Sequence, residues 1–291
     1  MTSQADERPF LTRSLVERLE VRELTADTFV GDAPVAYRSR VYGGHLLAQA
    51  LASAACTVPE NRPVLSLHAY FLRPGDPSVD LRYAVSRLRD GRSVSVRAVD
   101  VVQGSKVLAS VRASFLRVRA EEPMHEPMPA VPRPEELPPL HVRRSMPGAA
   151  PDGFNWVPDA EWARSSRPLD IRYVEPGSAA DRRCFWFRSE AGTHAAAEDS
   201  VVLAFASDRS LLPTILHARG ELRHQDHIPV ASVDHAMWFH AGVPAGNWCL
   251  YVQESEFGSS GLGLARGMIY AATGELVASV VQQGILSRTR G

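Results

Sequence analysis

The sequence predicts an α+β protein in which one unit, a buried helix wrapped by a curved antiparallel sheet, occurs twice in tandem. Three observations support this fold class. Ten of the 21 prolines lie between Pro123 and Pro158, and one helix followed by several strands is predicted on either side of them. Two short strings also match between the halves, one at an offset of 167 (His68–Phe71 with His235–Trp238) and one at 169 (Val107–Val111 with Leu276–Val280).

The first half begins with a predicted helix over His45–Cys56, which follows Gly43 and Gly44 and is apolar on nearly all sides. Such a helix is typically enclosed by other elements. Four strand-like runs come next, centred on His68, Tyr83, Val99 and Val111. The dipeptide Asp90–Gly91 between two of them predicts a tight hairpin.

The second half has the same layout. We predict a helix over residues 195–212, followed by strands over 231–239, 249–256, 262–271 and 275–287. Because each element must cover its apolar face, the hairpin-joined strands should form an antiparallel sheet around the helix. The expected units are residues 1–118 and 166–291. A proline-rich linker over 119–165 should lack regular structure, because proline lacks an N–H group and has a fixed φ angle.

The composition of the chain argues against several classes of partner. The 291 residues are 45% hydrophobic and 22% charged, and the formal net charge of −1 gives no electrostatic case for nucleic acid as a partner. No apolar run approaches the ~20 residues that span a bilayer, and the start does not resemble a signal peptide. We therefore expect a cytoplasmic protein with no membrane partner. Cys56, Cys184 and Cys249 are far apart and should remain reduced.

We expect neither a metal nor a cofactor, and a small molecule as the partner. His224 and His227 have a spacing that could ligate a metal ion. Arg223 is adjacent, however, and no cysteine or carboxylate framework accompanies them. We interpret this segment as a solvated loop.

Longer strings carry a family resemblance: VYGGHLLAQAL, LHAYFLRPGD, LRDGRSVSVRAV, ASDRSLLP, SVDHAMWFH and GELVASVVQQGIL. Through them the chain resembles the acyl-CoA thioesterase II family, the double-hotdog thioesterases, over nearly its whole length. The resemblance implies a double-hotdog fold and hydrolysis of fatty acyl-CoA to free acid and CoA. It also implies that an Asp, a Thr or Ser, and a Gln hold a water molecule. By position these are Asp208, Ser232 and Gln282. This chain has Ser232 and His45. These are two departures from the family pattern, because the resemblance implies Thr and Gln at these places in many relatives.

Asp208 has an unusual place for a carboxylate. It lies late in the predicted helix, five residues before Pro213, where the helix dipole is negative. Burial and the dipole should both raise its pKa and make it a better base. The alternatives are an ion pair with Arg209 or a solvated last turn.

Gln282 and Gln283 are adjacent on a predicted strand, so they face opposite sides. The repeat alignment sets Gln282 opposite Ala113 in the inward alternation and Gln283 opposite Ser114 in the outward one. A buried amide needs hydrogen-bond partners, which Asp208 and a water could supply. The alternative is a structural glutamine that satisfies backbone groups.

Ser232 lies two residues before Asp234, so both should leave the strand on one face, and Asp234 is a rival carboxylate. The repeat alignment sets aliphatic residues opposite all three candidate polar residues: Leu65 opposite Ser232, Ala113 opposite Gln282 and Ala52 opposite Asp208. We infer that one working site remains per chain.

The expected reaction is the addition of water to the thioester carbonyl, with Asp208 as the base. For the oxyanion we expect backbone N–H groups at Gly44 and His45, because a helix N-terminus offers unpaired donors. The alternative is that the glycines only turn the chain. A titratable His45 beside the substrate path could change acyl preference or pH dependence. His68 and His235 occupy equivalent repeat positions, which favours shared packing over catalysis.

Two other functions stay open. A hotdog hydratase acting on enoyl-CoA would pair Asp with a His five residues onward, where this chain has Pro213. A non-catalytic acyl-CoA-binding protein would have the same fold. Exposed sheet edges and the resemblance favour a dimer or a larger homo-oligomer.

Overall fold

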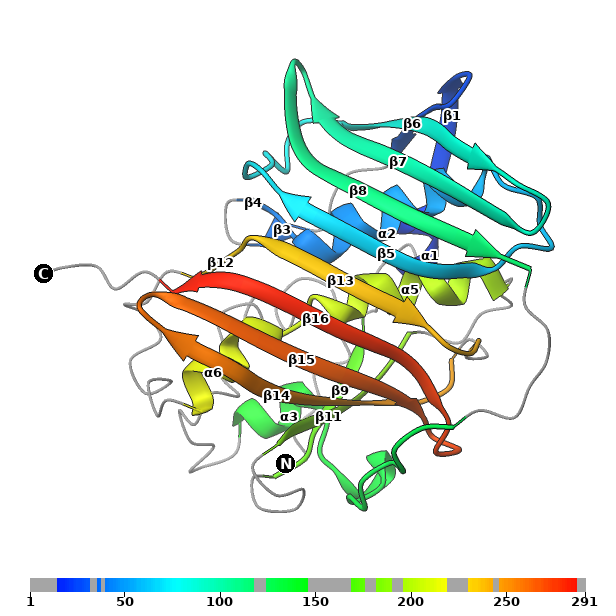
Figure 1. Cartoon of the computed structure of the whole chain (residues 1–291). Coiled ribbons are helices and arrows are strands. Elements are labelled where there is room, and N and C mark those ends of the chain that lie inside the picture. Colours follow the sequence, from blue (N-terminus) through cyan, green and yellow to red (C-terminus); the bar gives the residue numbers. More distant parts are fainter. Residues whose placement is uncertain are drawn as a thin grey trace, which may run out of the picture.

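The computed structural model of the chain describes residues 15–31, 36–37, 40–117, 124–145, 169–175, 182–189, 196–218, 230–242 and 246–286. These residues form a 13-stranded antiparallel sheet that curves around two helices, α2 (Gly43–Ala55) and α5 (Ala196–Ser207), as Figure 1 shows. The predicted α+β class with antiparallel strands is confirmed.

The first half contains six strands of this sheet: β1 (Val21–Thr25), β2 (Thr28–Gly31), β5 (Val64–Phe71), β6 (Leu81–Asp90), β7 (Val94–Gln103) and β8 (Lys106–Leu116). Helix α1 (Leu15–Leu19) precedes them, and the short ribbon of β3 (Ala36–Tyr37) and β4 (Arg40–Val41) precedes α2. The predicted hairpin joins β6 to β7, where Gly91 N donates to Val94 O at 2.8 Å.

The second half contributes seven strands: β9 (Asp170–Tyr173), β11 (Arg183–Arg188), β12 (Val230–Ser232), β13 (Asp234–Phe239), β14 (Cys249–Ser259), β15 (Leu262–Ala271) and β16 (Leu276–Leu286). Helix α6 (Leu211–Ala218) follows α5. The segment between the halves contains η1 (Pro134–Glu136) and α3 (Leu140–Ser145).

The strand order is the same when read from either edge of the sheet. It is β1-β2-β6-β7-β8-β5 and then β13-β16-β15-β14-β11-β9, with β12 also paired to β16. Each half thus places two strands before its central helix and four strand positions after it, and β5 pairs with β13 in the middle. The sequence prediction found the helix and the later strands of each half and missed the two earlier strands.

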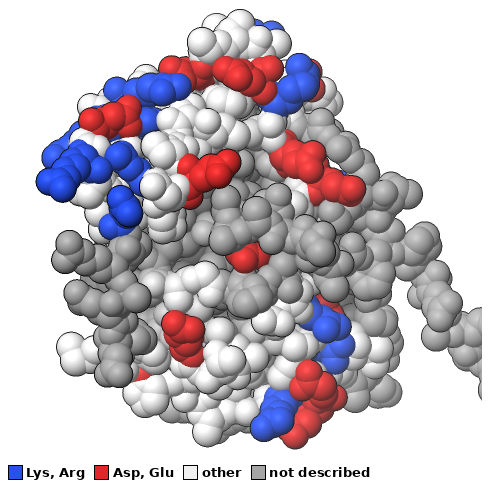
Figure 2. Space-filling view, turned by 90° about the vertical axis from the view of Figure 1, so that its right-hand side faces the viewer, with Lys and Arg blue, Asp and Glu red and all other residues white. Residues whose placement is uncertain are grey.

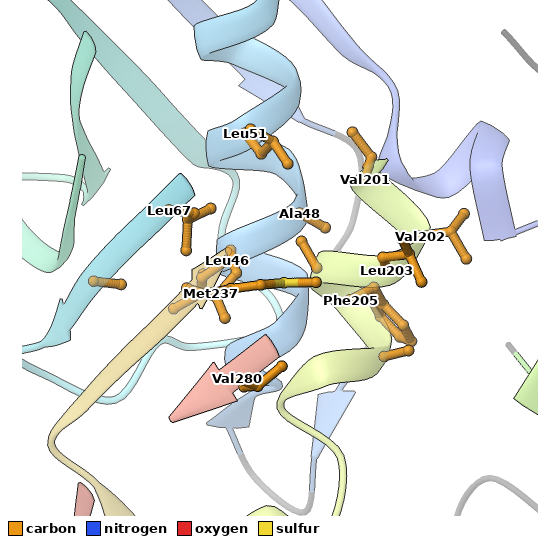
Figure 3. Close-up of a cluster of buried hydrophobic side chains, with 14 of the residues drawn as sticks. Leu46, Ala48, Leu51, Leu67, Val201, Val202, Leu203, Phe205, Met237 and Val280 are labelled. Carbon is orange, nitrogen blue, oxygen red and sulfur yellow. The ribbon is translucent and has the colours of Figure 1, made fainter. Parts of the chain in front are cut away.

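Helices α2 and α5 pack against each other under the centre of the sheet. Figure 3 shows Leu46 of α2 and Phe205 of α5 close to Met237 of β13 and Val280 of β16, and all four are buried. Helix α2 is buried from Gly44 to Leu51 on nearly all sides, as its apolar circumference predicted. One continuous core therefore joins both halves.

Strands β8 and β16 share one burial pattern at the predicted offset. The inward residues of β8 include Val111 and Ala113, and those of β16 include Val280 and Gln282. Gln282 is 0% exposed, whereas Gln283 is partly exposed on the other face. The predicted inward direction of Gln282 is confirmed.

The predicted equivalence of His68 and His235 is wrong by one position. The pairing of β5 with β8, and of β13 with β16, aligns Leu67 with His235 and His68 with Ala236. His68 is exposed, and its ring lies 5.3 Å from that of Trp238. His235 is 1% exposed and faces the core. Shared packing therefore does not explain the two histidines.

The same ladder corrects the counterpart of Ser232. Ser232 pairs with Gly284, and Val64 pairs with Phe115 at the matching place in the first half. Val64 is thus the counterpart of Ser232, and the predicted Leu65 is one residue off. The position is still aliphatic.

Asp208 and its predicted counterpart, Ala52, differ in their place along the two central helices. Asp208 is the first residue after α5, and Cys56 is the first residue after α2. The predicted counterpart, Ala52, lies inside α2. The strand pairing aligns the sheets of the two halves and not their helices, so the equivalence of Ala52 and Asp208 stays a prediction.

The helix predicted over 195–212 is two helices. Helix α5 ends at Ser207, and α6 begins at Leu211. Ser210, between them, has a φ of 54°, in the left-handed region that a continuing helix cannot use. Pro213 lies in the first turn of α6, where its missing N–H group costs no helical hydrogen bond.

The proline-rich segment contains more regular structure than predicted. Helices η1 and α3 lie within it, and residues of the segment pack on a second apolar cluster that includes Trp186 and Leu250. Trp186 Nε1 donates to Pro132 O at 2.9 Å. A side chain of the sheet thus donates a hydrogen bond to a carbonyl group of this segment, since proline has no backbone N–H to donate.

Charged side chains of both signs lie next to one another on the face shown in Figure 2. In the described part of the chain, no helix combines the length and the apolar character needed to cross a membrane. The three cysteines are free thiols.

Candidate active site

Asp208 lies in the break between α5 and α6, and side chains of β14 hold that break. Tyr251 Oη donates to Ser207 O at 2.7 Å, and Gln253 Nε2 donates to Arg209 O at 2.7 Å. Both of these side chains are 0% exposed. They satisfy carbonyl groups at the end of a helix, where intrahelical partners are lacking. The carboxylate between them is thereby held in place.

A bulge between β12 and β13 separates Ser232 from Asp234. The pairing with β16 shifts by one residue between Ser232 and Ala236. His235 therefore faces the core, and Asp234 faces the other side, where its Oδ1 accepts a hydrogen bond from Gln283 N at 2.9 Å. The expectation that Ser232 and Asp234 share a face is wrong, and Asp234 is not a rival carboxylate here.

Gln282 joins Asp208 to Ser232. Its Nε2 donates to Asp208 Oδ1 at 2.7 Å and to Ser232 Oγ at 2.8 Å. An amide nitrogen carries two hydrogens, so it can serve both acceptors at once. The three predicted residues therefore meet, and the interpretation of Gln282 as a glutamine that only satisfies backbone groups is wrong.

The second oxygen of Asp208 is bound by the start of α2. Gly44 N donates to Asp208 Oδ2 at 3.0 Å. Among the described residues, the hydrogen-bond partners of this carboxylate are Gln282 and Gly44, so the predicted alternative of a pair with Arg209 is not observed. The helix N-terminus thus binds an anion, as predicted, but the anion is the side chain of Asp208.

This arrangement corrects the expectation for the oxyanion. The N–H group of Gly44 is occupied by Asp208, and that of His45 donates to Tyr42 O at 3.1 Å. The His45 side chain is 0% exposed and does not border the cavity described below. It is therefore not beside the substrate path in this structure.

The glycine pair is required for close approach. A Cβ at Gly43 would lie 2.7 Å from Asp208 Oδ2, and a Cβ at Gly44 would lie 2.3 Å from Phe205 O. Such distances are shorter than any van der Waals contact, so only glycine lets α2 approach α5 and the carboxylate this closely. The alternative that these glycines only turn the chain is wrong.

Burial raises the pKa of Asp208 from 3.8 to about 6. The hydrogen bonds from Gln282 and Gly44 and the positive charge of Arg40 act in the opposite direction and lower this pKa. The pKa of Asp208 therefore shifts in the predicted direction, and burial is the main cause. A carboxyl group with this pKa is ionised at neutral pH and is a stronger base than an exposed Asp.

The three residues border a cavity of about 250 Å³. Apolar side chains that line it include Leu46, Phe71 and Leu212, and the basic side chains of Arg40 and Arg73 also line it. A reactive polar group thus faces a space with both apolar and cationic walls. Asp208 itself is only partly exposed, through this opening.

Comparisons with known proteins identify the family of the chain. A model of the family described as acyl-CoA thioesterase matches residues 158–285, and one described as the acyl-CoA thioesterase N-terminal domain matches residues 32–116. Acyl-coenzyme A thioesterase 8 of Mus musculus is 35% identical over 272 residues, which cover 85% of this chain and 80% of the mouse protein.

The chain belongs to the acyl-CoA thioesterase family.

Solved structures of similar proteins support the same family and show the fold. The structure of an acyl-CoA thioesterase II from Mycobacterium marinum is 32% identical, with a TM-score of 0.78, covering 96% of this chain and all of that one (100%). A hotdog-fold protein of unknown function from Alicyclobacillus acidocaldarius is 19% identical, with a TM-score of 0.73 over 95% of this chain and 99% of that one. This chain therefore has a hotdog fold and is a thioester hydrolase that cleaves acyl-CoA.

Sequence reasoning missed the side chains that support Asp208 and Gln282. Tyr251 and Gln253 hold the break at Asp208, and His235 lies beside Gln282. Their alternation along buried strands could have suggested that Tyr251 and Gln253 share a face. The metal candidates His224 and His227 lie outside the described residues.

Proposed function

We propose that this acyl-CoA thioesterase hydrolyses its substrate with a water molecule held by Asp208, Ser232 and Gln282. The observation that carries the proposal is the single amide nitrogen of Gln282 bound to both Asp208 and Ser232 at the wall of a cavity. Burying such a polar cluster costs free energy, and titratable groups with strongly shifted pKa values are concentrated at functional sites.

Each residue has a distinct role in the proposed mechanism. Asp208 accepts a proton from the water as the water oxygen attacks the thioester carbonyl, since its raised pKa suits a general base. Ser232 orients the water through its hydroxyl group, and Gln282, whose two amide hydrogens go to Asp208 and Ser232, holds those two side chains around the water. The Gly44 N–H group keeps the carboxylate in place while the proton is transferred. The C–S bond then breaks and the proton on Asp208 passes to the CoA sulfur, so the products are the free acid and the CoA thiol.

The cavity walls suit the two ends of an acyl-CoA. Leu46, Phe71 and Leu212 offer apolar contacts to an acyl chain. Arg73 is exposed, and Arg40 is partly exposed, so both can meet phosphate groups of CoA. We propose that the fatty acyl part enters the apolar side and the nucleotide part lies over the arginines.

We also propose that the fold is a double hotdog with one working site per chain. The repeats would be residues 1–118 and 166–291, joined by 119–165. A second cavity of about 600 Å³ at the other ends of α2 and α5 supports this, because Val64 lines it where the working cavity has Ser232. Ala113 likewise replaces Gln282 at the equivalent place in the sheet.

Three further proposals concern the setting of the enzyme. We propose a cytoplasmic location, a role in fatty acid metabolism, and a homo-oligomer of two or more copies. The oligomer would cover the sheet edges formed by β1 and β9, which present unpaired backbone groups among the described strands.

The test is release of free CoA thiol from acyl-CoAs with short, medium and long acyl chains. Asp208→Ala and Gln282→Ala should each lower turnover by about 100-fold or more. Asp234→Asn is the matched control, because Asp234 lies close in sequence to Ser232 but faces away from the cavity. A folded Asp208→Ala protein with wild-type turnover would refute the assignment.

A further inference from the structure

A buried histidine lies beside Gln282 on the inner face of the sheet. Ala236 pairs with Val281, so the preceding residue of β13, His235, stands opposite Gln282 of β16. Residues directly opposite in an antiparallel pair have Cβ atoms about 4.5–5.5 Å apart. His235 is 1% exposed and Gln282 is 0% exposed, and His235 does not border the cavity. The ring therefore lies behind the amide that joins Asp208 to Ser232.

Two buried polar atoms of this pair lack a partner among the described residues: Nδ1 of His235 and Oε1 of Gln282. The amide cannot rotate to change this. Its Nε2 serves Asp208 and Ser232, and an ionised carboxylate accepts hydrogen bonds only from the NH₂ side of an amide. Oε1 must therefore find a donor on the side away from Asp208.

The other nitrogen of the ring determines whether His235 can be that donor. His235 Nε2 lies 2.9 Å from Ser207 Oγ, which also lies 2.9 Å from Ala204 O. A hydroxyl has one hydrogen. If the hydroxyl donates to Ala204, Nε2 must carry the ring hydrogen, and Nδ1 and Oε1 face each other as two acceptors. If it donates to Nε2, the hydrogen is on Nδ1, and both buried atoms are satisfied.

We propose that His235 is a positioning residue, whose Nδ1–H donates to Oε1 of Gln282 and fixes the amide with its NH₂ group toward Asp208 and Ser232. This inference rests on the proposed function of those three residues. This hydrogen bond completes a chain of hydrogen-bonded side chains. The chain runs from Ser207, at the end of α5, through His235 of β13 and Gln282 of β16 to Asp208, the residue next to Ser207. The sheet thereby controls the orientation of the base.

The chemistry of the ring agrees with this role. Burial lowers the pKa of His235 to about 3, and the side chain of Gln282 acts in the opposite direction. The ring is therefore neutral at the pH of catalysis, which leaves Nε2 able to accept from Ser207. A neutral ring also adds no positive charge that would stabilise ionised Asp208 and weaken it as a base.

A direct test needs no turnover. In a long-range ¹H–¹⁵N correlation spectrum of the whole protein with ¹⁵N-labelled histidine, the His235 ring should show the Nδ1–H tautomer. The His235→Asn variant assigns the signal by its disappearance. The Nε2–H tautomer, or a charged ring at neutral pH, would overturn the proposal. This result is independent of whether Asp208 is the catalytic base.

A kinetic test uses variants that differ in one hydrogen bond. The Nδ2 amide of Asn can take the place of the imidazole Nδ1–H, whereas Leu cannot donate. His235→Leu should lower kcat about tenfold with little change in KM, and His235→Asn should retain most of kcat. In a Gln282→Leu background, His235→Leu should have no further effect, because no amide is left to orient.

Three kinetic outcomes contradict the proposal: equal losses from His235→Leu in both backgrounds, His235→Asn as slow as His235→Leu, or an effect of His235→Leu on KM alone. Loss of folding is checked by thermal unfolding of each variant. If the Leu variant does not fold, the comparison of His235→Asn with wild type and the tautomer of the wild-type ring still decide the question. If wild type releases no thiol from any acyl-CoA, the proposed function fails, and the tautomer alone tests the hydrogen bond.

Discussion

The pH dependence of turnover depends on the ionisation of Asp208. The base must be ionised to accept a proton, and burial raises its pKa from 3.8 to about 6. The value of kcat/KM should therefore rise as pH increases through about 6 and become constant above it. Arg40, which lowers the pKa of Asp208, keeps its charge over this range, and His235 stays neutral because its pKa is about 3.

Gln282→Leu should move this acid limb to higher pH. The substitution keeps an apolar side chain of similar length and removes the 2.7 Å hydrogen bond that favours ionised Asp208. A hydrogen bond to a charged group contributes about 1.5–3 kcal/mol, and about 1.4 kcal/mol corresponds to one pKa unit. The midpoint should therefore rise by about one to two units, in addition to the lower plateau.

The assay is thiol release from one acyl-CoA at subsaturating concentration between about pH 5 and pH 9. Asp234→Asn is again the control, and its limb should coincide with that of wild type, because Asp234 faces away from the cavity. A wild-type limb near the ordinary pKa of an Asp, or a limb of Gln282→Leu that moves to lower pH, would refute the reasoning.

Four other substitutions, at three positions, test the stability and the chemistry of the site. Asp208→Asn removes a charge whose burial raises the folded-state pKa by about two units, so urea unfolding should show a gain of up to about 3 kcal/mol above pH 6. The gain should disappear below 3.8, where the wild-type carboxyl group is protonated in both folded and unfolded states. Gly44→Ala places a Cβ 2.3 Å from Phe205 O, so thermal and urea unfolding should show a loss of about 1–3 kcal/mol, with activity lost as the Gly44 N–H group moves from Asp208. Ser232→Thr keeps the hydroxyl and should keep most of kcat, whereas Ser232→Ala should lower it about tenfold; equal rates for the two would remove Ser232 from the site.

Local patterns in the sequence were sufficient for several features of the site. Alternation put Gln282 and Gln283 on opposite sides of the last strand, because successive side chains of a strand face opposite sides, and the alignment with the first half placed Gln282 inward. The apolar circumference of α2 predicted an enclosed helix, and the glycine pair marked its start. The enclosed helix, its glycine start and the alternation depend on residues close together in the chain, whereas the inward direction of Gln282 depended on the repeat.

Some errors arose where one residue changes the geometry. The match of His68 with His235 was off by one position, which exchanges the inner and outer faces of a strand. The bulge between Ser232 and Asp234 has the same effect. The pattern of apolar and polar residues does not reveal the correct register or the bulge, because both are defined by the pairing with a partner strand.

The sequence by itself determined which residue types were available, the order of the elements and the inward direction of Gln282. Only the tertiary structure decided that the long predicted helix breaks at Asp208, because the break is stabilised by Tyr251 and Gln253 from a strand distant in the chain. It also decided that Gly44 binds the carboxylate and that His235 stands behind the amide. These contacts join segments that are distant in the chain, and local propensity carries no information about which distant groups will satisfy a buried polar atom.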